Sequence, residues 1–205
     1  AGTPDGVDPL LAREVSVLAR MYARNQMTPE EIAEQADLQS EISEIFVHFR
    51  ADLDGKPASE NDINNVLAQE RDTPRRRMAW EASKQIGREA APKVVKLVEA
   101  RNRAARRMGY RDYYAMSLAH DELDETWLFA LGDSLAAKTD ALFASEKARL
   151  DSALAAKFGV QPVEIGPWHY SDPFFQRAPA CGSVDLDPIF CGQDLPALAR
   201  RFYDG

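Results

Sequence analysis

The stretch PRRRMAWEASKQIGREAAPKVVKLVEARNRAARRMG, residues 74–109, decides the fold of this chain. Apolar side chains recur in it at the three- and four-residue spacing of one helix face: Met78, Ala82, Ile86, Ala90, Val94, Leu97 and Ala104. Pro92 interrupts the pattern, because proline donates no backbone hydrogen bond and disfavours helical geometry at Ala91. Gly109 stands where a glycine commonly ends a helix. The stretch predicts a long helical region that bends or breaks near Pro92.

The same signals recur on both sides of this stretch. Asp8, Thr28, Ser59 and Asp112 are capping residues, and each stands before an apolar run with helical periodicity. The expected helices are 8–25, 28–53, 60–71, 74–108, 113–123, 124–158 and 194–203. Six leucines of the longest one lie near a single stripe: Leu128, Leu131, Leu135, Leu142, Leu150 and Leu154. No alternating run rich in Val, Ile and Thr appears. The predicted fold class is all-α, a multi-helix array with long antiparallel helices.

One loop-rich stretch departs from the helical pattern. Residues 166–179, GPWHYSDPFFQRAP, contain three prolines and four aromatic residues around His169. Such a stretch is either an active-site loop or a connector whose aromatic side chains pack against the helices, and packing is the favoured interpretation. We call this stretch the connector.

Charge is segregated along the chain, whose net charge is −8. Residues 1–72 hold 6 Lys and Arg against 15 Asp and Glu, whereas residues 73–111 hold 12 against 3. Either these are separately solvated faces, or the basic segment lines a groove or packs under the acidic N-terminal helices. The acidic total argues against nucleic acid as the main partner. No apolar run of 18 residues is present to span a membrane.

The residues that usually carry chemistry are sparse. His48 lies on an apolar helix and is interpreted as a packed histidine, and His120 lacks the second histidine of an HExxH motif. His169 is the best functional candidate of the three. No nucleophile elbow, P-loop or dinucleotide fingerprint is present. The sequence predicts no metal ligand and no catalytic residue within this chain.

Cys181 and Cys191 lie in one loop-rich segment. In an exported protein the pair could close a small loop as a disulfide, and in the cytosol both would stay thiols. Both outcomes are open from the sequence.

Three segments carry a resemblance to a known family. RRRMAWEASKQIG, VVKLVEARNRAARRMGYRDYYAMSLA and AAKFGVQPVEIGPWHYSDPFFQ look like consecutive parts of the angiotensin-converting-enzyme-like zinc peptidases, including bacterial peptidyl dipeptidases, with oligopeptidases as more distant relatives. The resemblance covers most of the chain from about residue 28 onward. RNRAARRMGYRDYY is its most specific part, and the first helix adds nothing to it.

The resemblance implies a nearly all-helical, two-lobed enzyme with a deep cleft that cleaves short peptides, often releasing C-terminal dipeptides. The family binds zinc through an HExxH helix and a downstream glutamate, and its helix glutamate activates the zinc-bound water. Because the cleft is walled by both lobes, the resemblance also allows His169 and Tyr170 to face substrate. Many of the resembled enzymes act outside the cytosol, so the resemblance allows a periplasmic or secreted location, and the sequence itself leaves the compartment unknown.

This sequence departs from the family pattern because it contains no HExxH. We therefore expect residues 1–205 to be the N-terminal helical portion of a larger peptidase, inactive alone, with the C-terminal half of the same protein as its partner. Residues 1–72 would be acidic, lid-like helices, residues 73–159 a long-helix core, and residues 160–205 the connector and final helix. Zinc would belong to the parent protein and not to this chain. The alternative is a free-standing α-helical binding or scaffold domain without catalysis.

Overall fold

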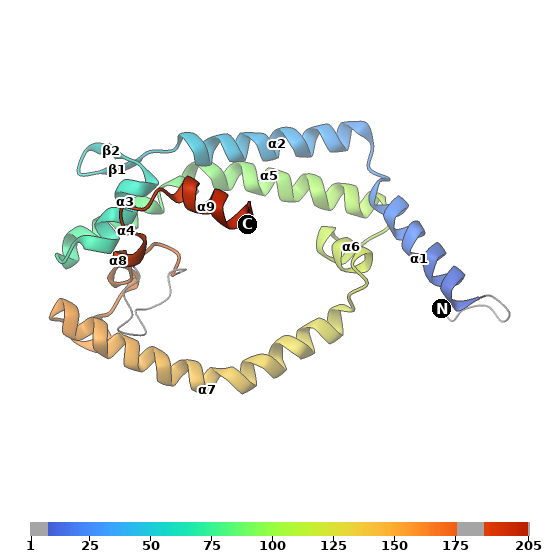
Figure 1. Ribbon diagram of the computed structural model, residues 1–205. Coiled ribbons are helices and arrows are strands. Elements are labelled where there is room, and N and C mark those ends of the chain that lie inside the picture. The colour runs from blue at the N-terminus through green and yellow to red at the C-terminus, as the bar shows by residue number, and fades with distance from the viewer. Residues whose placement is uncertain (1–7, 176–186, 205) are drawn as a thin grey trace. The chain divides into compact units, whose positions relative to one another are not determined.

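The computed structural model describes residues 8–175 and 187–204. The chain divides into two compact units, Ala1–Phe174 and Phe175–Gly205, which are described separately. The first unit contains the elements α1 Pro9–Arg24, α2 Pro29–His48, β1 Ala51–Leu53, β2 Lys56–Ala58, α3 Glu60–Gln69, α4 Thr73–Ser83, α5 Ile86–Arg107, α6 Tyr113–His120, α7 Glu125–Phe158, and the 3-10 turns η1 Pro162–Glu164 and η2 Pro167–His169 (Figure 1). The second contains α8 Asp187–Phe190 and α9 Leu195–Tyr203. The all-α prediction is confirmed.

Most helix ends form where the sequence predicts them. Thr28 and Ser59 each accept the N3 backbone N–H while the N3 carboxylate accepts theirs, so α2 and α3 begin with complete capping boxes. Asp112 caps α6 by accepting from the backbone N–H of Ala115. Gly159 ends α7 with φ 67°, the left-handed conformation that glycine adopts without strain.

The helical region that was expected to bend or break near Pro92 does not break there. Pro92 lies inside α5, and the chain turns between α4 and α5 at Lys84 and Gln85 instead. Pro92 is exposed, so water can replace the backbone donor that proline lacks. The turn between α4 and α5 is fixed by Gln85. Its side-chain oxygen accepts from the backbone N–H of Asp52 at 2.9 Å, and its side-chain amide donates to the Asp52 carbonyl. A partner 33 residues away therefore sets the turn.

The helix expected over residues 28–53 ends at His48, and residues 51–58 form a small antiparallel hairpin. Leu53 pairs with Lys56, so only Asp54 and Gly55 remain in the loop. Both have positive φ, 57° and 74°, as a two-residue loop of the Asp-Gly type requires. The hairpin supplies Ala51 and Ala58 to the main core.

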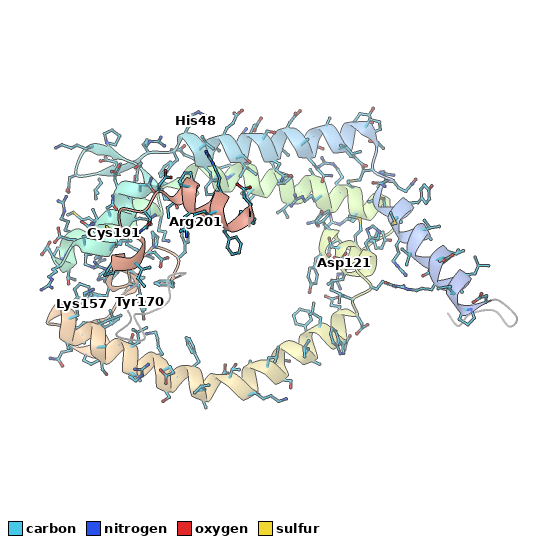
Figure 2. The ribbon with its side chains drawn as sticks, in the orientation of Figure 1. His48, Asp121, Lys157, Tyr170, Cys191 and Arg201 are labelled. Atoms are coloured by element: carbon cyan, nitrogen blue, oxygen red, sulfur yellow. The ribbon has the colours of Figure 1, made fainter. Side chains whose placement is uncertain are left out.

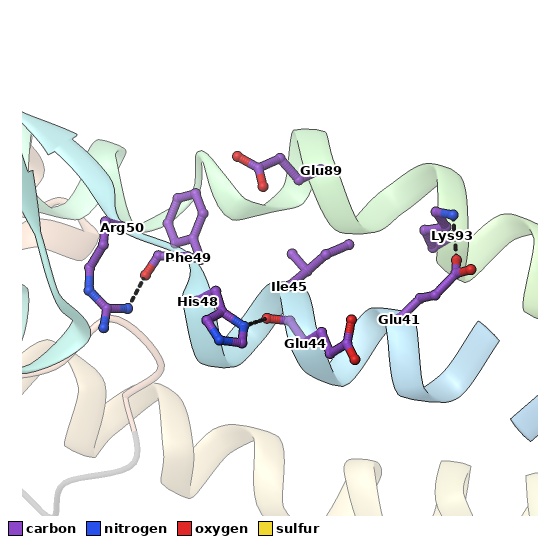
Figure 3. A pocket seen from close by; sticks show the side chains of 8 residues that line it. All are labelled: Glu41, Glu44, Ile45, His48, Phe49, Arg50, Glu89 and Lys93. Atoms are coloured by element: carbon purple, nitrogen blue, oxygen red, sulfur yellow. Dashed lines mark hydrogen bonds and ion pairs between the residues drawn. The ribbon is translucent and has the colours of Figure 1, made fainter. Parts of the chain in front are cut away.

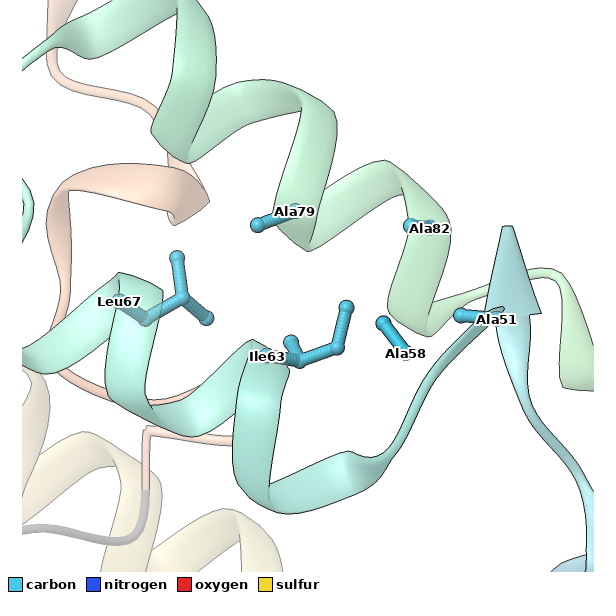
Figure 4. Packing of buried hydrophobic residues seen from close by; sticks show 6 residues of the cluster. All are labelled: Ala51, Ala58, Ile63, Leu67, Ala79 and Ala82. Carbon is cyan, nitrogen blue, oxygen red and sulfur yellow. The ribbon is translucent and has the colours of Figure 1, made fainter. Parts of the chain in front are cut away.

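The core lies where the hairpin, α3 and α4 meet (Figure 4). Its buried members are small or branched: Ala51, Ala58, Ile63, Leu67, Ala79 and Ala82. Because four of the six are alanines, the backbones of these elements can approach closely.

The acidic α2 packs antiparallel to the basic α5 (Figure 1). Glu31 pairs with Arg107 at 2.7 Å, Glu34 with Arg103 at 2.6 Å, and Glu41 with Lys93. Small buried side chains of α5 let the helices approach: Ala90, Ala100 and Ala104. Of the two interpretations of charge segregation, the structure shows the packed one for these helices. Among the described helices, none is long and apolar enough to cross a membrane.

Candidate functional site

The connector is held to the helices by one arginine. Arg76 of α4 is only 1 % exposed. Its guanidinium donates to four backbone carbonyls: Leu67 at 2.7 Å, and Glu70, Trp168 and Tyr170 at 2.8 Å each. The first two carbonyls belong to the C-terminal end of α3, where helix carbonyls lack partners. A single cation therefore joins α3, α4 and the connector.

The end of α7 completes this arrangement. The Arg76 guanidinium lies over the Phe158 ring, 4.6 Å from its centroid, a cation–π contact. Burial lowers the pKa of Arg76, opposed by the charge of Glu70, and an arginine remains cationic under such a shift. We refer to α3, α4, the end of α7 and residues 166–174 as the Arg76 corner.

His169 lies inside the Arg76 corner and is 2 % exposed. Its Nδ1 accepts the backbone N–H of Gly166 at 2.9 Å, and its Nε2 is 3.3 Å from the hydroxyl of Thr73. Its ring packs against Phe158, with centroids 5.1 Å apart. Burial lowers the pKa of His169, and the charge of Arg76 lowers it further. The neutral imidazole is the form that fits this site.

Tyr170 is half-buried beside α7 (Figure 2). Its hydroxyl donates to Asp151 Oδ1 at 3.1 Å, and Lys147 pairs with the same carboxylate at 2.6 Å. The structure thus gives both predicted substrate-facing residues, His169 and Tyr170, partners within the protein. Their role toward substrate stays a prediction.

Aromatic and cationic side chains cover the outer side of the connector. Trp168 meets Trp80 edge to face at a centroid distance of 6.2 Å. Lys84 lies over the rings of Trp80 and Phe174 and donates to the Pro173 carbonyl at 3.0 Å. Burial lowers the pKa of Lys84. Trp168 and Tyr170 therefore contact helices, as the packing interpretation expects, whereas Phe174 stays 58 % exposed with Lys84 over its ring.

A second feature is an open groove of about 470 Å³ between the C-terminal end of α2 and the start of α5 (Figure 3). It is lined by Glu41, Glu44, Ile45, His48, Phe49, Arg50, Glu89 and Lys93. His48 Nδ1 lies 3.0 Å from the Glu44 carbonyl of its own helix, and its side chain is exposed. The interpretation of His48 as a packed histidine is therefore wrong. The lining of the groove combines three carboxylates, Glu41, Glu44 and Glu89, with the cations Arg50 and Lys93. Within residues 8–175 and 187–204, no group of three or more His, Cys, Asp and Glu could hold a metal ion.

The predicted disulfide cannot be placed, because Cys181 lies outside the described residues. Cys191 is exposed, at the end of α8 (Figure 2). The pairing of Cys181 with Cys191 stays a prediction.

Comparison with known proteins adds one match. The family model described as angiotensin-converting enzyme matches residues 3–148. The chain belongs to the angiotensin-converting enzyme family. No curated protein and no solved structure matches the chain.

The match to the angiotensin-converting enzyme family and the resemblance read from the sequence differ in extent. The match includes α1, which the resemblance left aside, and two of the three quoted segments. It ends within α7, before the third segment and the connector. Arg76 and the α2–α5 groove lie within the matched range, whereas His169 and Tyr170 lie beyond it. The interpretation of the connector consequently rests on its contacts.

Proposed function

We propose that this chain forms the helical scaffold of a zinc-dependent peptidase that cleaves short peptides. The observation that carries the proposal is the match to the angiotensin-converting enzyme family, which spans α1 to most of α7. In this proposal the helices form the structural framework of the enzyme, and the Arg76 corner holds α3, α4 and the connector together.

The residues of this chain do not supply a site for the catalytic zinc of such a peptidase. The sequence has no HExxH, and the described residues offer no ligand cluster for zinc. Zinc in such enzymes polarises a carbonyl and activates water. We assign that chemistry to polypeptide other than these 205 residues, and we derive no catalytic step from this chain. The proposal makes the chain inactive by itself.

The test compares two proteins made from the same gene. One is the 205-residue chain, and the other is a longer product that includes an HExxH segment. Zinc content is measured by plasma mass spectrometry, and cleavage of a set of short peptides is followed by mass spectrometry. We expect the short chain to hold no stoichiometric zinc and to cleave nothing, and the longer product to cleave peptides.

Two results would overturn this assignment. Zinc-dependent hydrolysis by the 205-residue chain alone would contradict its inactivity. If the gene encodes no HExxH segment, or if the longer product cleaves no peptide, a binding or scaffold domain without catalysis becomes the better description.

A further inference from the structure

The hydrogen bonds of His169 fix where its proton lies. The backbone N–H of Gly166 can only donate, so Nδ1 of His169, 2.9 Å away, must accept and carries no hydrogen. In the neutral ring Nε2 then carries the proton and donates it to the Thr73 hydroxyl. A protonated ring carries a hydrogen on Nδ1 as well, which would face the N–H of Gly166 and abolish that bond.

The groups around His169 offer little stabilisation for a positively charged imidazolium beside the Arg76 cation. The charged groups on the elements packed around His169 include Glu70, Arg76, Arg77, Lys84, Lys147, Asp151, Lys157 and Asp172. None of them forms an ion pair with His169 among the described contacts. Arg76 is the one whose charge acts on it, and it shares the Phe158 ring with His169. An imidazolium would thus be a second buried cation on the same aromatic ring.

The carboxylates nearby are engaged elsewhere. Asp151 binds Lys147 and the Tyr170 hydroxyl, and Glu70 accepts from the backbone N–H groups of Arg71 and Asp72. Asp172 accepts the backbone N–H of Phe174 at 2.9 Å. Turning one of them toward His169 would cost a bond that holds its own segment.

We propose that His169 is an acid-sensitive latch, and that its protonation releases the connector from α4. The two connector carbonyls that flank it, Trp168 and Tyr170, are bound by Arg76, so movement of His169 loosens both bonds. Loss of these contacts frees the aromatic packing between Trp168 and Trp80. The latch is independent of zinc and of peptide cleavage.

The direction of the pH effect follows from the environment of the ring. Burial lowers the pKa of His169 in the closed latch, whereas the released ring regains the ordinary histidine value. The released form therefore binds the proton more tightly. The closed form is fully favoured above about pH 6.5 and is weakened as the pH falls below that value.

The experiment is hydrogen–deuterium exchange of the 205-residue chain at pH 7.5 and pH 5.0, corrected for the intrinsic pH dependence of exchange. We expect amides of residues 166–172 to open more often at pH 5.0, by up to about 30-fold, the limit for a released histidine of pKa near 6.5. His169→Asn keeps an acceptor near the Nδ1 position but cannot gain a proton, so its corrected exchange should not depend on pH. His48→Asn, on the exposed end of α2, should behave like the wild type.

A change below twofold in the wild type, or an equal change in His169→Asn, would overturn the latch. If the asparagine variant does not fold, carbon-13 NMR titration of the wild-type histidines decides. The latch requires His169 to titrate below the ordinary value of about 6.5, and a His169 pKa at or above that value contradicts it.

Discussion

The Arg76 corner and the middle of α7 belong to the same unit but are built in opposite ways. In the corner, a buried arginine donates hydrogen bonds to four carbonyls, and the residues of the adjoining core are buried. Along residues 129–146 of α7, every side chain is exposed, including Leu135, Phe143 and Leu142, which is 67 % exposed. The residues that the structure describes cover the central side chains of the corner, but they do not cover those in the middle of α7.

The sequence of α7 explains this difference. Its predicted leucine stripe includes Leu131, Leu135 and Leu142, and Phe129 and Phe143 lie on another side of the same helix. Large apolar side chains that lie exposed along one helix, as Leu135, Leu142 and Phe143 do, are typical of a surface that another surface covers. This chain therefore buries the centre of the Arg76 corner with its own residues, whereas the apolar side chains in the middle of α7 remain exposed.

The largest expected effect comes from removing the central cation of the corner. Arg76→Met leaves four carbonyls without their donor, and each buried, unsatisfied group costs about 1–3 kcal/mol. We expect the free energy of unfolding to fall by at least about 3 kcal/mol. Urea unfolding followed by tryptophan fluorescence measures it. Arg77→Met is the control, since Arg77 is exposed; a similar small loss in both variants would show that the corner does not depend on Arg76.

Two leucines compare the regions directly. Leu67 is 1 % exposed in the core, and Leu67→Ala should cost about 2–5 kcal/mol through lost contacts and a cavity. Leu142→Ala, in the middle of α7, should change stability by no more than about 0.5 kcal/mol. Thermal and urea unfolding of both variants provide the measurement. Equal losses would mean that Leu142 is buried in the protein in solution.

Two glycines give a smaller contrast. A Cβ at Gly166 would lie 2.5 Å from the Trp168 ring, so Gly166→Ala must displace that ring, at a cost of about 1–3 kcal/mol. Nothing lies within 4 Å of a Cβ at Gly132 in α7, so Gly132→Ala should gain about 0.5–1 kcal/mol from helix propensity. Circular dichroism melting of the pair tests both signs, and destabilisation by Gly132→Ala would contradict the open surroundings of α7.

The smallest expected effect comes from the ion pairs between α2 and α5. These pairs lie at the surface, whereas Arg76 is buried. The Arg107 guanidinium and the Thr28 backbone N–H lower the pKa of Glu31 to about 2. The stabilisation from Glu31 is therefore present above about pH 4.5 and is lost as the pH falls toward 2. Glu31→Gln should reduce the drop in melting temperature between pH 6 and pH 3. Glu14→Gln in α1 is the control, and an identical pH profile for all three proteins would show that the pair contributes nothing.

Local signals in the sequence were sufficient for most of the positions at which helices begin. The capping residues Thr28 and Ser59 act on groups three positions away, so neighbouring residues determine the outcome. The bend at Lys84 and Gln85 could not be predicted this way, since its partner Asp52 comes from the hairpin. Pro92 misled the prediction because its exposed position tolerates the missing donor.

The site was only partly predictable for the same reason. The connector was recognised from its prolines and aromatic residues, and its described part contacts α4 and α7 through both ring packing and hydrogen bonds. Arg76, however, is one of three consecutive arginines, and such a run usually indicates a solvated surface. What makes it the centre of the corner is a set of carbonyls up to 94 residues away, which no local pattern contains.

Native-state hydrogen exchange of the 205-residue chain at pH 7.5 tests the central contrast most directly, because it reports the opening free energy of each segment. We predict that amides of α4, residues 73–83, exchange only with unfolding of the corner. Amides of residues 132–146 in α7 should exchange far faster, through openings that leave the corner intact. Equal protection of the two segments would contradict the account, because it would mean that the middle of α7 is packed as firmly as the corner.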